Sequence, residues 1–256
     1  MSIQRLIEKI RNNDVVLWAG SGLSFYAGMP KVSEIINEIL EKCTEEEKNY
    51  IQGKTNLAEV ANDFIAMRSG SRHELNTILF NLIDKDPSSL KYHKMLSEIP
   101  QINTIITTNY DKLFELAYER DIYPIISNSH IPYANSKRVD LYKVHGDIGV
   151  PDSILISSKD YTEFFNEEQN PIWTKIKSIV AEKTILFVGF SLADQNIDYL
   201  INNVIRSLGS NQKEFFLVSP NMPPFKVNEL KSKKVEYINM TGEDFITQVH
   251  SEIKKK

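Results

Sequence analysis

The chain has 256 residues, of which 41% are hydrophobic and 25% are charged. This balance is typical of a folded globular protein of one large domain, and it excludes wholesale disorder. Lysine and arginine number 30 against 34 aspartate and glutamate residues, and the resulting net charge of −4 excludes broad electrostatic attraction to nucleic acid or anionic lipid.

The cysteine count and the hydropathy of the chain exclude further kinds of site and of protein. The single cysteine, Cys43, excludes a disulfide within the chain and a structural zinc site built on several cysteines. The first residues lead into a mixed-charge stretch rather than an apolar signal region, and no window approaches the ~18 apolar residues of a membrane span. We therefore expect a cytoplasmic protein that binds neither membrane nor nucleic acid directly.

Apolar strands alternate with helices along the chain. Short β-branched or aromatic runs predict strands at residues 15–18, 104–107, 123–126, 140–144, 184–188, 214–218 and 235–238. Helical spacing of apolar residues predicts helices at 2–12, 112–118, 194–208 and from 241 onward, and largely helical stretches at 34–96 and 157–180. The alternation predicts a three-layer α/β fold, in which helices cover both faces of a parallel sheet.

We expect one domain over residues 1–256. The stretches 34–96 and 157–180 would be helical insertions that form a smaller layer over the cleft. Four aromatic residues of the second stretch fit either a simple core or a partner surface: Tyr161, Phe164, Phe165 and Trp173.

Four polar clusters follow predicted strands, where ligands of an open parallel sheet bind. The first, Gly-Ser-Gly-Leu-Ser at residues 20–24, has glycines that allow a tight turn whose backbone amides can face a pyrophosphate. Phe25 stands where the common dinucleotide motif has its third glycine. A glycine turn without any ligand therefore fits this segment equally well.

The second cluster is Thr-Thr-Asn-Tyr-Asp at residues 107–111. Thr108 and Asp111 suit the capping of the next helix, whereas the neutral amide of Asn109 can hold a sugar hydroxyl or a water. In the third cluster His145 precedes Gly146 in a loop. A histidine there can act as a base near neutral pH, with a purely structural role as the alternative.

The fourth cluster begins at Gly189 and Ser191, and Asp194 can cap the helix that follows. A capped strand-to-helix turn is the plain interpretation of this segment. The occurrence of all four clusters in order on one sheet edge favours a ligand site.

Together these motifs resemble the sirtuin family, specifically the divergent bacterial branch of sirtuin-like domains found in antiphage defence proteins. Residues 20–24 and 27–30 resemble its G-A-G-x-S and G-I-P signature, and residues 107–111 have the T-T-N-Y-D form typical of the defence branch. His145-Gly146 is similar to the catalytic H-G pair, and residues 189–192 are similar to the G-x-S-L loop.

The resemblance implies a Rossmann-like sheet with NAD in an extended cleft and cleavage of the bond between nicotinamide and ribose. By resemblance, Gly20, Ser21, Gly22 and Ser24 would hold the diphosphate. Asn109 would contact the nicotinamide ribose or orient water, Asp111 would recognise nicotinamide, and His145 would be the general base. Gly189 and Ser191 would line the adenosine side, and the motifs add Pro30, Thr108, Gly146, Asp194 and Asn196 as binding residues.

Two departures from the family pattern shape the functional expectation. Deacylating sirtuins carry a four-cysteine zinc module, which a chain with only Cys43 cannot build, and Pro30 is followed by Lys-Val-Ser rather than D-F-R. We therefore expect an NAD⁺ hydrolase that needs no metal and passes ribose to water. By resemblance it would be the toxic effector of an antiphage defence system, causing abortive infection by depleting NAD.

Restraint of such an activity would come from a homo-oligomer or from a regulatory partner protein encoded nearby. The alternatives are an NAD-dependent deacylase or ADP-ribosyltransferase, and a non-catalytic module that senses NAD or ADP-ribose. Product analysis would separate hydrolysis from deacylation and transfer.

Overall fold

The computed structural model describes residues 2–134, 137–165, 170–190 and 213–255. Within these ranges seven strands form one parallel sheet in the order β3-β4-β2-β1-β5-β6-β7. The strands are β1 (Val15–Ala19), β2 (Thr104–Thr107), β3 (Ile122–Ile125), β4 (Val139–Lys143), β5 (Thr184–Val188), β6 (Phe215–Val218) and β7 (Val235–Ile238). This architecture confirms the predicted α/β, Rossmann-like class.

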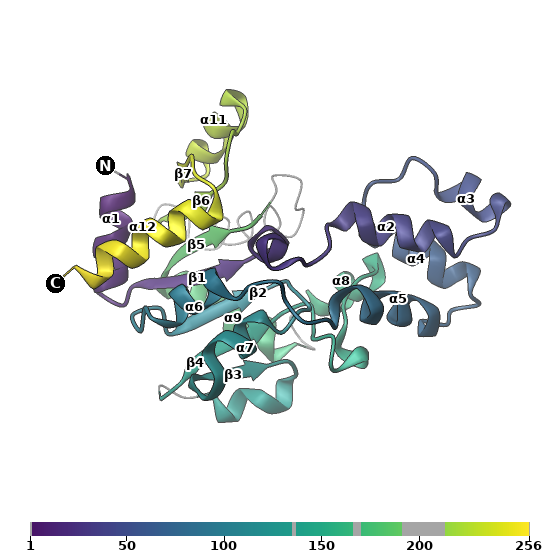
Figure 1. Ribbon diagram of the computed structural model, residues 1–256, viewed down its shortest axis with the longest axis horizontal. Helices are drawn as coiled ribbons and strands as arrows, with labels where there is room; N and C mark the ends of the chain where they lie inside the picture. Colours follow the sequence, from purple (N-terminus) through teal and green to yellow (C-terminus); the bar gives the residue numbers. More distant parts are fainter. Residues whose placement is uncertain (1, 135–136, 166–169, 191–212, 256) are drawn as a thin grey trace.

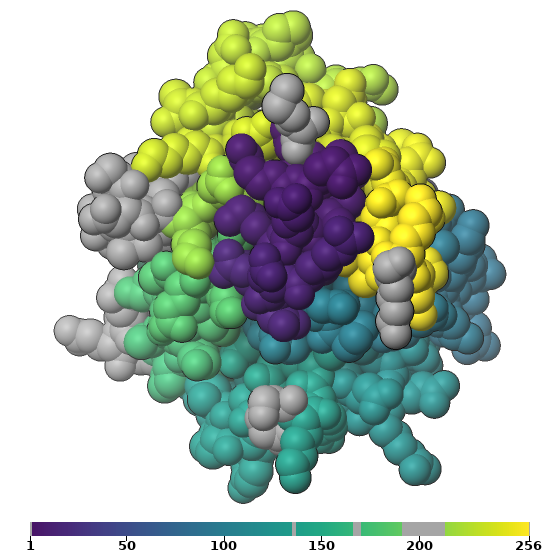
Figure 2. Space-filling model, turned by 90° about the vertical axis from the view of Figure 1, so that its left-hand side faces the viewer, coloured from purple at the N-terminus to yellow at the C-terminus, as the bar shows by residue number. Residues whose placement is uncertain are grey.

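Helices cover both faces of the sheet. One face carries α1 (Ser2–Arg11), α6 (Lys91–Ser97), α7 (Leu113–Tyr118) and α12 (Gly242–Lys254), and the other carries α9 (Pro171–Glu182) and α11 (Pro224–Ser232). Figure 2 shows α1 beside α12 on one end of the molecule.

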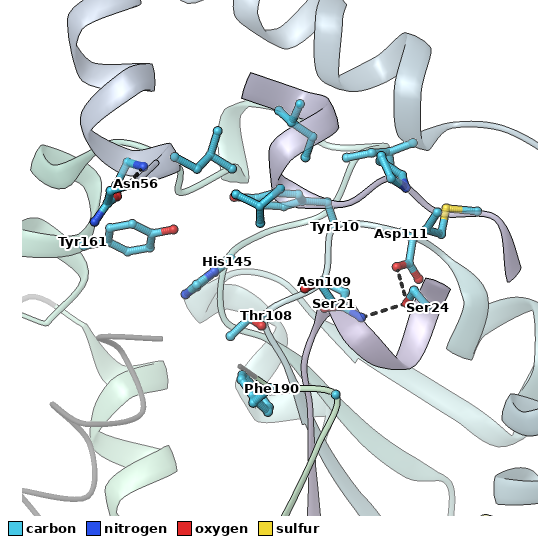
Figure 3. Close-up of a pocket in the computed structure, with 18 of the residues that line it drawn as sticks. Ser21, Ser24, Asn56, Thr108, Asn109, Tyr110, Asp111, His145, Tyr161 and Phe190 are labelled. Atoms are coloured by element: carbon cyan, nitrogen blue, oxygen red, sulfur yellow. Dashed lines mark hydrogen bonds between the residues drawn. The ribbon is translucent and has the colours of Figure 1, made fainter. Parts of the chain in front are cut away.

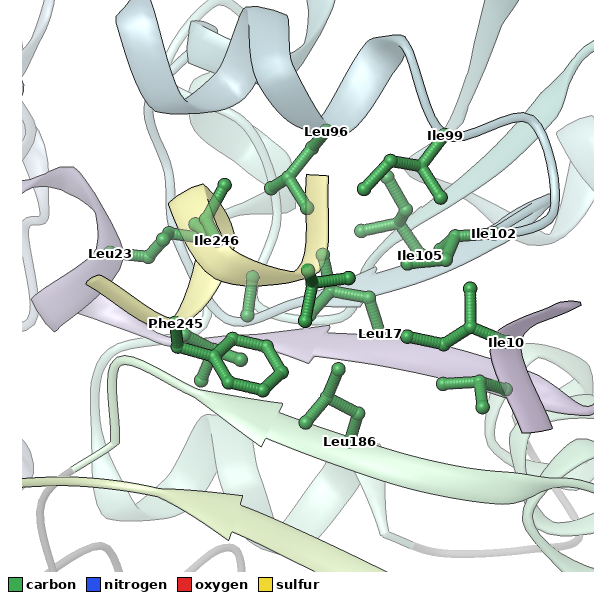
Figure 4. Close-up of a cluster of buried hydrophobic side chains, with 14 of the residues drawn as sticks. Ile10, Leu17, Leu23, Leu96, Ile99, Ile102, Ile105, Leu186, Phe245 and Ile246 are labelled. Carbon is green, nitrogen blue, oxygen red and sulfur yellow. The ribbon is translucent and has the colours of Figure 1, made fainter. Parts of the chain in front are cut away.

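The alternation of side chains along β1 explains why helices pack on both faces of the sheet. Val15, Leu17 and Ala19 belong to the core under α1 and α12, whereas Val16 and Trp18 belong to the opposite core. Successive side chains of a strand point to opposite faces, so an unbroken apolar strand is buried from both sides. Figure 4 shows the first of these cores, with Leu17 among side chains of several helices.

A separate group of helices lies beyond the carboxyl ends of the strands (Figure 1). It consists of α2 (Val32–Glu41), α3 (Glu45–Ile51), α4 (Leu57–Met67) and α5 (His73–Ile83), and α8 (Ser158–Phe164) contacts α4. This helical layer has its own hydrophobic core, which includes Ile39, Phe64 and Leu75. Four 3₁₀ segments complete the described elements: η1 (Ser21–Ala27), η2 (Glu119–Asp121), η3 (Asn128–Tyr133) and η4 (Pro151–Ser153).

Some elements differ from the sequence-based expectation. Helix α11 was not predicted, because Leu230 is its one buried residue and no apolar periodicity marks it. The expected loop at 19–22 runs into η1 instead. The helix predicted at 194–208 lies outside the described residues, and the division into one domain with two helical insertions stays a prediction. Among the described residues, no helix combines the length and hydropathy that crossing a membrane requires.

Two glycine loops cross at the carboxyl ends of β1 and β5. The Gly22 amide donates to the Gly189 carbonyl oxygen (2.8 Å), and the Gly20 amide donates to the Val188 carbonyl oxygen (2.9 Å). A Cβ on Gly189 would lie 2.3 Å from the Leu23 nitrogen, and this glycine has a φ of +81°. The crossing therefore requires glycine for two reasons, space and backbone conformation.

Replacing Gly189 with alanine should expose the cost of this crossing. We expect Gly189→Ala to lower the free energy of unfolding by about 3 kcal/mol, because the added carbon overlaps backbone and the φ is strained. Gly53→Ala is the matched control, since Gly53 has a φ of +88° and no atom within 4 Å; it should cost about 1 kcal/mol. Urea denaturation measures both, and equal losses would contradict the steric argument.

Candidate active site

The four polar clusters meet at one cavity of about 720 Å³. Its floor comes from the carboxyl ends of β1, β2, β4 and β5, whose hydrogen-bonded register brings these ends to one edge. The predicted site residues that line it are Ser21, Ser24, Pro30, Thr108, Asn109, Asp111, His145 and Gly189. Figure 3 shows Asn109, Thr108 and His145 on the same cavity, with Ser24 and Asp111 at one end.

The remaining predicted residues do not line this cavity or lie outside the description. Gly20 and Gly22 form the loop crossing, and Gly146 has a φ of +91° where a Cβ would lie 2.2 Å from the Ser153 carbonyl oxygen. These glycines shape the loops that carry Ser21, Ser24 and His145, and contact with a ligand stays a prediction for them. Three predicted residues fall outside the described residues: Ser191, Asp194 and Asn196.

A chain of buried hydrogen bonds links three of the lining residues. Asn109 Nδ2 donates to Ser24 Oγ (2.9 Å), and Ser24 Oγ donates to Asp111 Oδ2 (2.8 Å). Asn109 Nδ2 also donates to the Gly20 carbonyl oxygen (3.1 Å). Two acceptors therefore fix the amino end of the Asn109 amide toward the protein.

The carbonyl end of the same amide is left without a partner. Asn109 is 6% exposed, and its Oδ1 has no hydrogen-bond partner among the described residues. Leaving a buried acceptor unpaired costs free energy. An acceptor held in this way on a cavity wall suits a hydroxyl group or a water that comes with the ligand.

Asp111 is held as an acceptor. Its Oδ1 accepts from the Leu113 amide (3.1 Å), so the side chain also caps the start of α7, as the sequence suggested. Burial raises the pKa of Asp111, while Lys143, the Leu113 amide and Ser24 act in the opposite direction.

His145 lies between the sheet edge and α8. Its ring centroid is 5.0 Å from that of Tyr161, and burial lowers its pKa to about 3. The imidazole is therefore neutral at pH 7, which is the form that can accept a proton or a hydrogen bond. Next to it, Tyr110 donates to the Leu155 carbonyl oxygen (2.7 Å), and the Leu155 amide donates to the His145 carbonyl oxygen (2.9 Å).

The sequence predicted a helical layer over the cleft from residues 34–96 and 157–180, but it named no residue of that layer as part of the site. The outer wall of the cavity comes from residues 55–59 at the start of α4 and from Ser158, Tyr161 and Phe165 in and after α8. Arg72 ties this wall to the sheet edge by bonds to Asp160 Oδ1 (2.7 Å) and the Ile154 carbonyl oxygen (2.8 Å). The available signal was Asn56, whose side chain caps α4, but capping does not reveal what the helix faces.

In the described ranges, no group of three or more histidine, cysteine or acidic side chains is arranged to hold a metal ion. What the cavity offers is a neutral imidazole, an unpaired amide carbonyl and a carboxylate. Such groups bind and orient hydroxyls and water, and they can move a proton.

A family model and several curated proteins are similar in sequence to this chain. The model of the SIR2-like domain matches residues 103–238. Proteins named NAD(+) hydrolase ThsA are similar, with 28% identity over 220 residues in Acinetobacter baumannii and 29% over 221 residues in Enterococcus faecium. Each match covers 84% of this chain and 44% or 45% of the relative.

A further relative is Defense-associated sirtuin 2 of Bacillus subtilis, 28% identical over 229 residues, which are 86% of this chain and 22% of that protein. The chain thus spans less than half the length of these curated relatives.

The low pKa of His145 predicts an acid sensitivity of the fold. The unfolded histidine binds a proton near pH 6.5, whereas the folded one does so only near pH 3. The contribution of His145 to the free energy of unfolding is complete above pH 6.5 and is lost as the pH falls toward 3. Between pH 7 and pH 4 we expect wild type to lose about 3 kcal/mol more unfolding free energy than His145→Asn.

Urea denaturation at several pH values measures this difference. His73→Asn, which changes an exposed histidine of α5, should follow the wild-type profile. Parallel curves for wild type and His145→Asn would contradict the buried, neutral imidazole.

Proposed function

The chain belongs to the family of SIR2-like domains, and on this basis we propose that it hydrolyses NAD⁺ to ADP-ribose and nicotinamide. The observation that carries the proposal is the unpaired Oδ1 of Asn109 on the same cavity as the neutral His145. The names of the ThsA relatives, which cover 84% of this chain, support the same reaction.

Hydrolysis of NAD⁺ begins with cleavage of the bond between the ribose carbon and the nicotinamide nitrogen. The C–N bond electrons leave with the nicotinamide nitrogen, and positive charge develops on the ribose. A water then forms a bond to the same ribose carbon and loses a proton. The protein must hold the leaving group, shield the cation and position the water.

The residues of this cavity match those tasks. The free carbonyl of Asn109 can accept a hydrogen bond from a ribose hydroxyl or from the attacking water. Neutral His145 can accept a proton from a ribose hydroxyl, and the carboxylate of Asp111 favours the cationic nicotinamide ring of NAD⁺. Ser21, Ser24 and Gly189 line the end where we propose that the diphosphate and the adenosine bind.

Water is the acceptor that we propose for the ribose. The single cysteine excludes the four-cysteine zinc module of deacylating sirtuins. Polar residues of α4 and α8 close the outer side of the cavity. The Defense-associated sirtuin name of one relative supports a role as the effector that depletes cytoplasmic NAD during phage infection, under restraint by self-association or a partner protein.

Incubation of the purified protein with NAD⁺ tests the reaction directly. We expect equal amounts of free nicotinamide and ADP-ribose by chromatography. With acylated peptides or proteins present, O-acyl-ADP-ribose would instead identify a deacylase, and ADP-ribose on protein would identify a transferase. Binding of NAD⁺ with no product would favour a sensing module.

Removing either named group should abolish most turnover. We expect His145→Ala and Asn109→Ala to lower kcat by about 10²–10⁴-fold, because proton transfer and water positioning are lost, while both variants stay folded by circular dichroism. The controls His73→Ala and Asn49→Ala change exposed residues of α5 and α3 and should keep wild-type rates. A His145→Ala variant with the wild-type rate would refute the assignment.

A further inference from the structure

The imidazole of His145 has an aromatic neighbour on the opposite wall of the cavity. His145 follows β4 at the sheet edge, whereas Tyr161 belongs to α8. The centroids of the two rings are 5.0 Å apart, and the ring planes make an angle of 53°. Both side chains line the cavity (Figure 3). Tyr161 therefore contacts the group to which we assign the proton transfer.

The backbone of His145 is fixed by a hydrogen bond, but its side chain is not. The Leu155 amide donates to the His145 carbonyl oxygen (2.9 Å). In the part of the chain that the structure describes, neither ring nitrogen of His145 has a hydrogen-bond partner. A histidine that acts in a site commonly takes its ring orientation from a hydrogen bond at one of its nitrogens. Here packing must orient the imidazole, and Tyr161 supplies a ring contact for it.

Tyr161 also lies against the loop that carries Asn109. Its hydroxyl group meets that of Tyr110, which follows Asn109 in the chain. Tyr110 in turn donates to the Leu155 carbonyl oxygen (2.7 Å), and Leu155 is the residue whose amide holds the His145 backbone. The contacts of the Tyr161 ring and hydroxyl therefore join the side chain of His145 to the segment that anchors its backbone.

The residue before Tyr161 fixes the first turn of α8. Asp160 Oδ2 accepts from the amides of Ile156 and Ser157 (both 2.9 Å). Its Oδ1 accepts from Arg72 at the start of α5 (2.7 Å). A side chain can hold a neighbour in place only where its own backbone is fixed, and these three bonds meet that condition for Tyr161.

We propose that Tyr161 is a positioning residue, whose ring holds the His145 imidazole in the orientation that proton transfer requires. A misplacement of a reacting group by about 1 Å can cost about 10²-fold in rate, so the loss of this neighbour should be measurable. The effect on turnover rests on the proposed NAD⁺ hydrolysis, whereas the effect on the mobility of the imidazole does not require turnover.

Replacement of Tyr161 separates the role of its ring from that of its hydroxyl group. We expect Tyr161→Leu to lower kcat for NAD⁺ hydrolysis by about 10–100-fold, because the imidazole loses its aromatic neighbour. Tyr161→Phe keeps the ring and should keep most of the wild-type kcat. The matched control Tyr50→Leu changes a tyrosine of α3 that is 64% exposed, and it should keep the wild-type rate. A wild-type kcat in Tyr161→Leu, or equal losses in Tyr161→Leu and Tyr161→Phe, would overturn the proposal.

The same substitution in a chain without the imidazole tests whether Tyr161 acts through His145. In His145→Ala a positioning residue has nothing left to position, so Tyr161→Leu should not lower the residual kcat of that variant further. A residue that contacts NAD⁺ or supports the fold by itself would cost the same factor in both backgrounds, and that result would overturn the proposal. All rates are compared at saturating NAD⁺, so that a change in KM does not enter.

A second measurement is independent of activity. Relaxation of the imidazole ¹³C–H groups, assigned with His145→Asn, reports how tightly the ring is held on the ps–ns timescale. The order parameter of the His145 ring should fall in Tyr161→Leu and keep its wild-type value in Tyr161→Phe. If wild type releases no nicotinamide from NAD⁺, the proposed function fails, and this relaxation still tests Tyr161.

A wild-type order parameter in Tyr161→Leu would refute the role of Tyr161. If Tyr161→Leu fails to fold by circular dichroism, Tyr161→Met takes its place in each measurement. The unbranched methionine side chain fills the space without an aromatic ring, and the same outcomes then decide the question.

Discussion

The carbonyl oxygen of Gly189 accepts a hydrogen bond from the Gly22 amide across the ends of β1 and β5. This contact leaves no room for a side chain at Gly20, Gly22 or Gly189. It lies where the chain changes from one side of β1 to the other. A strand order that reverses at this point opens a crevice at the carboxyl ends. The position of Ser21, Ser24 and Asn109 follows from that crossing, because Asn109 bonds to the Gly20 carbonyl oxygen.

From this contact the site is built by hydrogen bonds that converge on Asp111. Asn109 donates to Ser24, Ser24 donates to Asp111, and the Asp111 carbonyl accepts from Lys143. Each side chain contributes a different kind of group, namely an amide, a hydroxyl and a carboxylate, so none can be exchanged for its neighbour without losing a bond. The outcome is one free carbonyl on the cavity wall, which a fully paired polar network would not provide.

The sheet and the strand-end clusters could be predicted from the sequence because both follow local patterns. Continuous apolar runs such as 184–188 identify buried strands, and polar residues directly after them must lie at one edge of a parallel sheet. Lys143 could not be found in this way, since a lysine in a strand is usually solvated and its partners Glu115 and Asp147 lie on other segments. The helical layer over the cleft was expected, but its cavity-lining residues in α4 and α8 could not be named, because which side of a helix faces the cavity depends on tertiary packing. Helix α11 was not predicted from the sequence because Leu230 is its one buried residue, which leaves no apolar periodicity to recognise.

The helical layer buries its own hydrophobic core, distinct from the two cores of the sheet. Protein regions open in cooperative units defined by the apolar contacts that they share. The core of the helical layer also includes Leu113 of α7 and Ile148, Ile154 and Ile156 of the segment that follows His145, so the cavity mouth shares apolar contacts with the loops of the site. Access to the cavity and the placement of His145 consequently depend on some of the same packed residues, so a change in this core that widens the mouth would also displace the loop behind it.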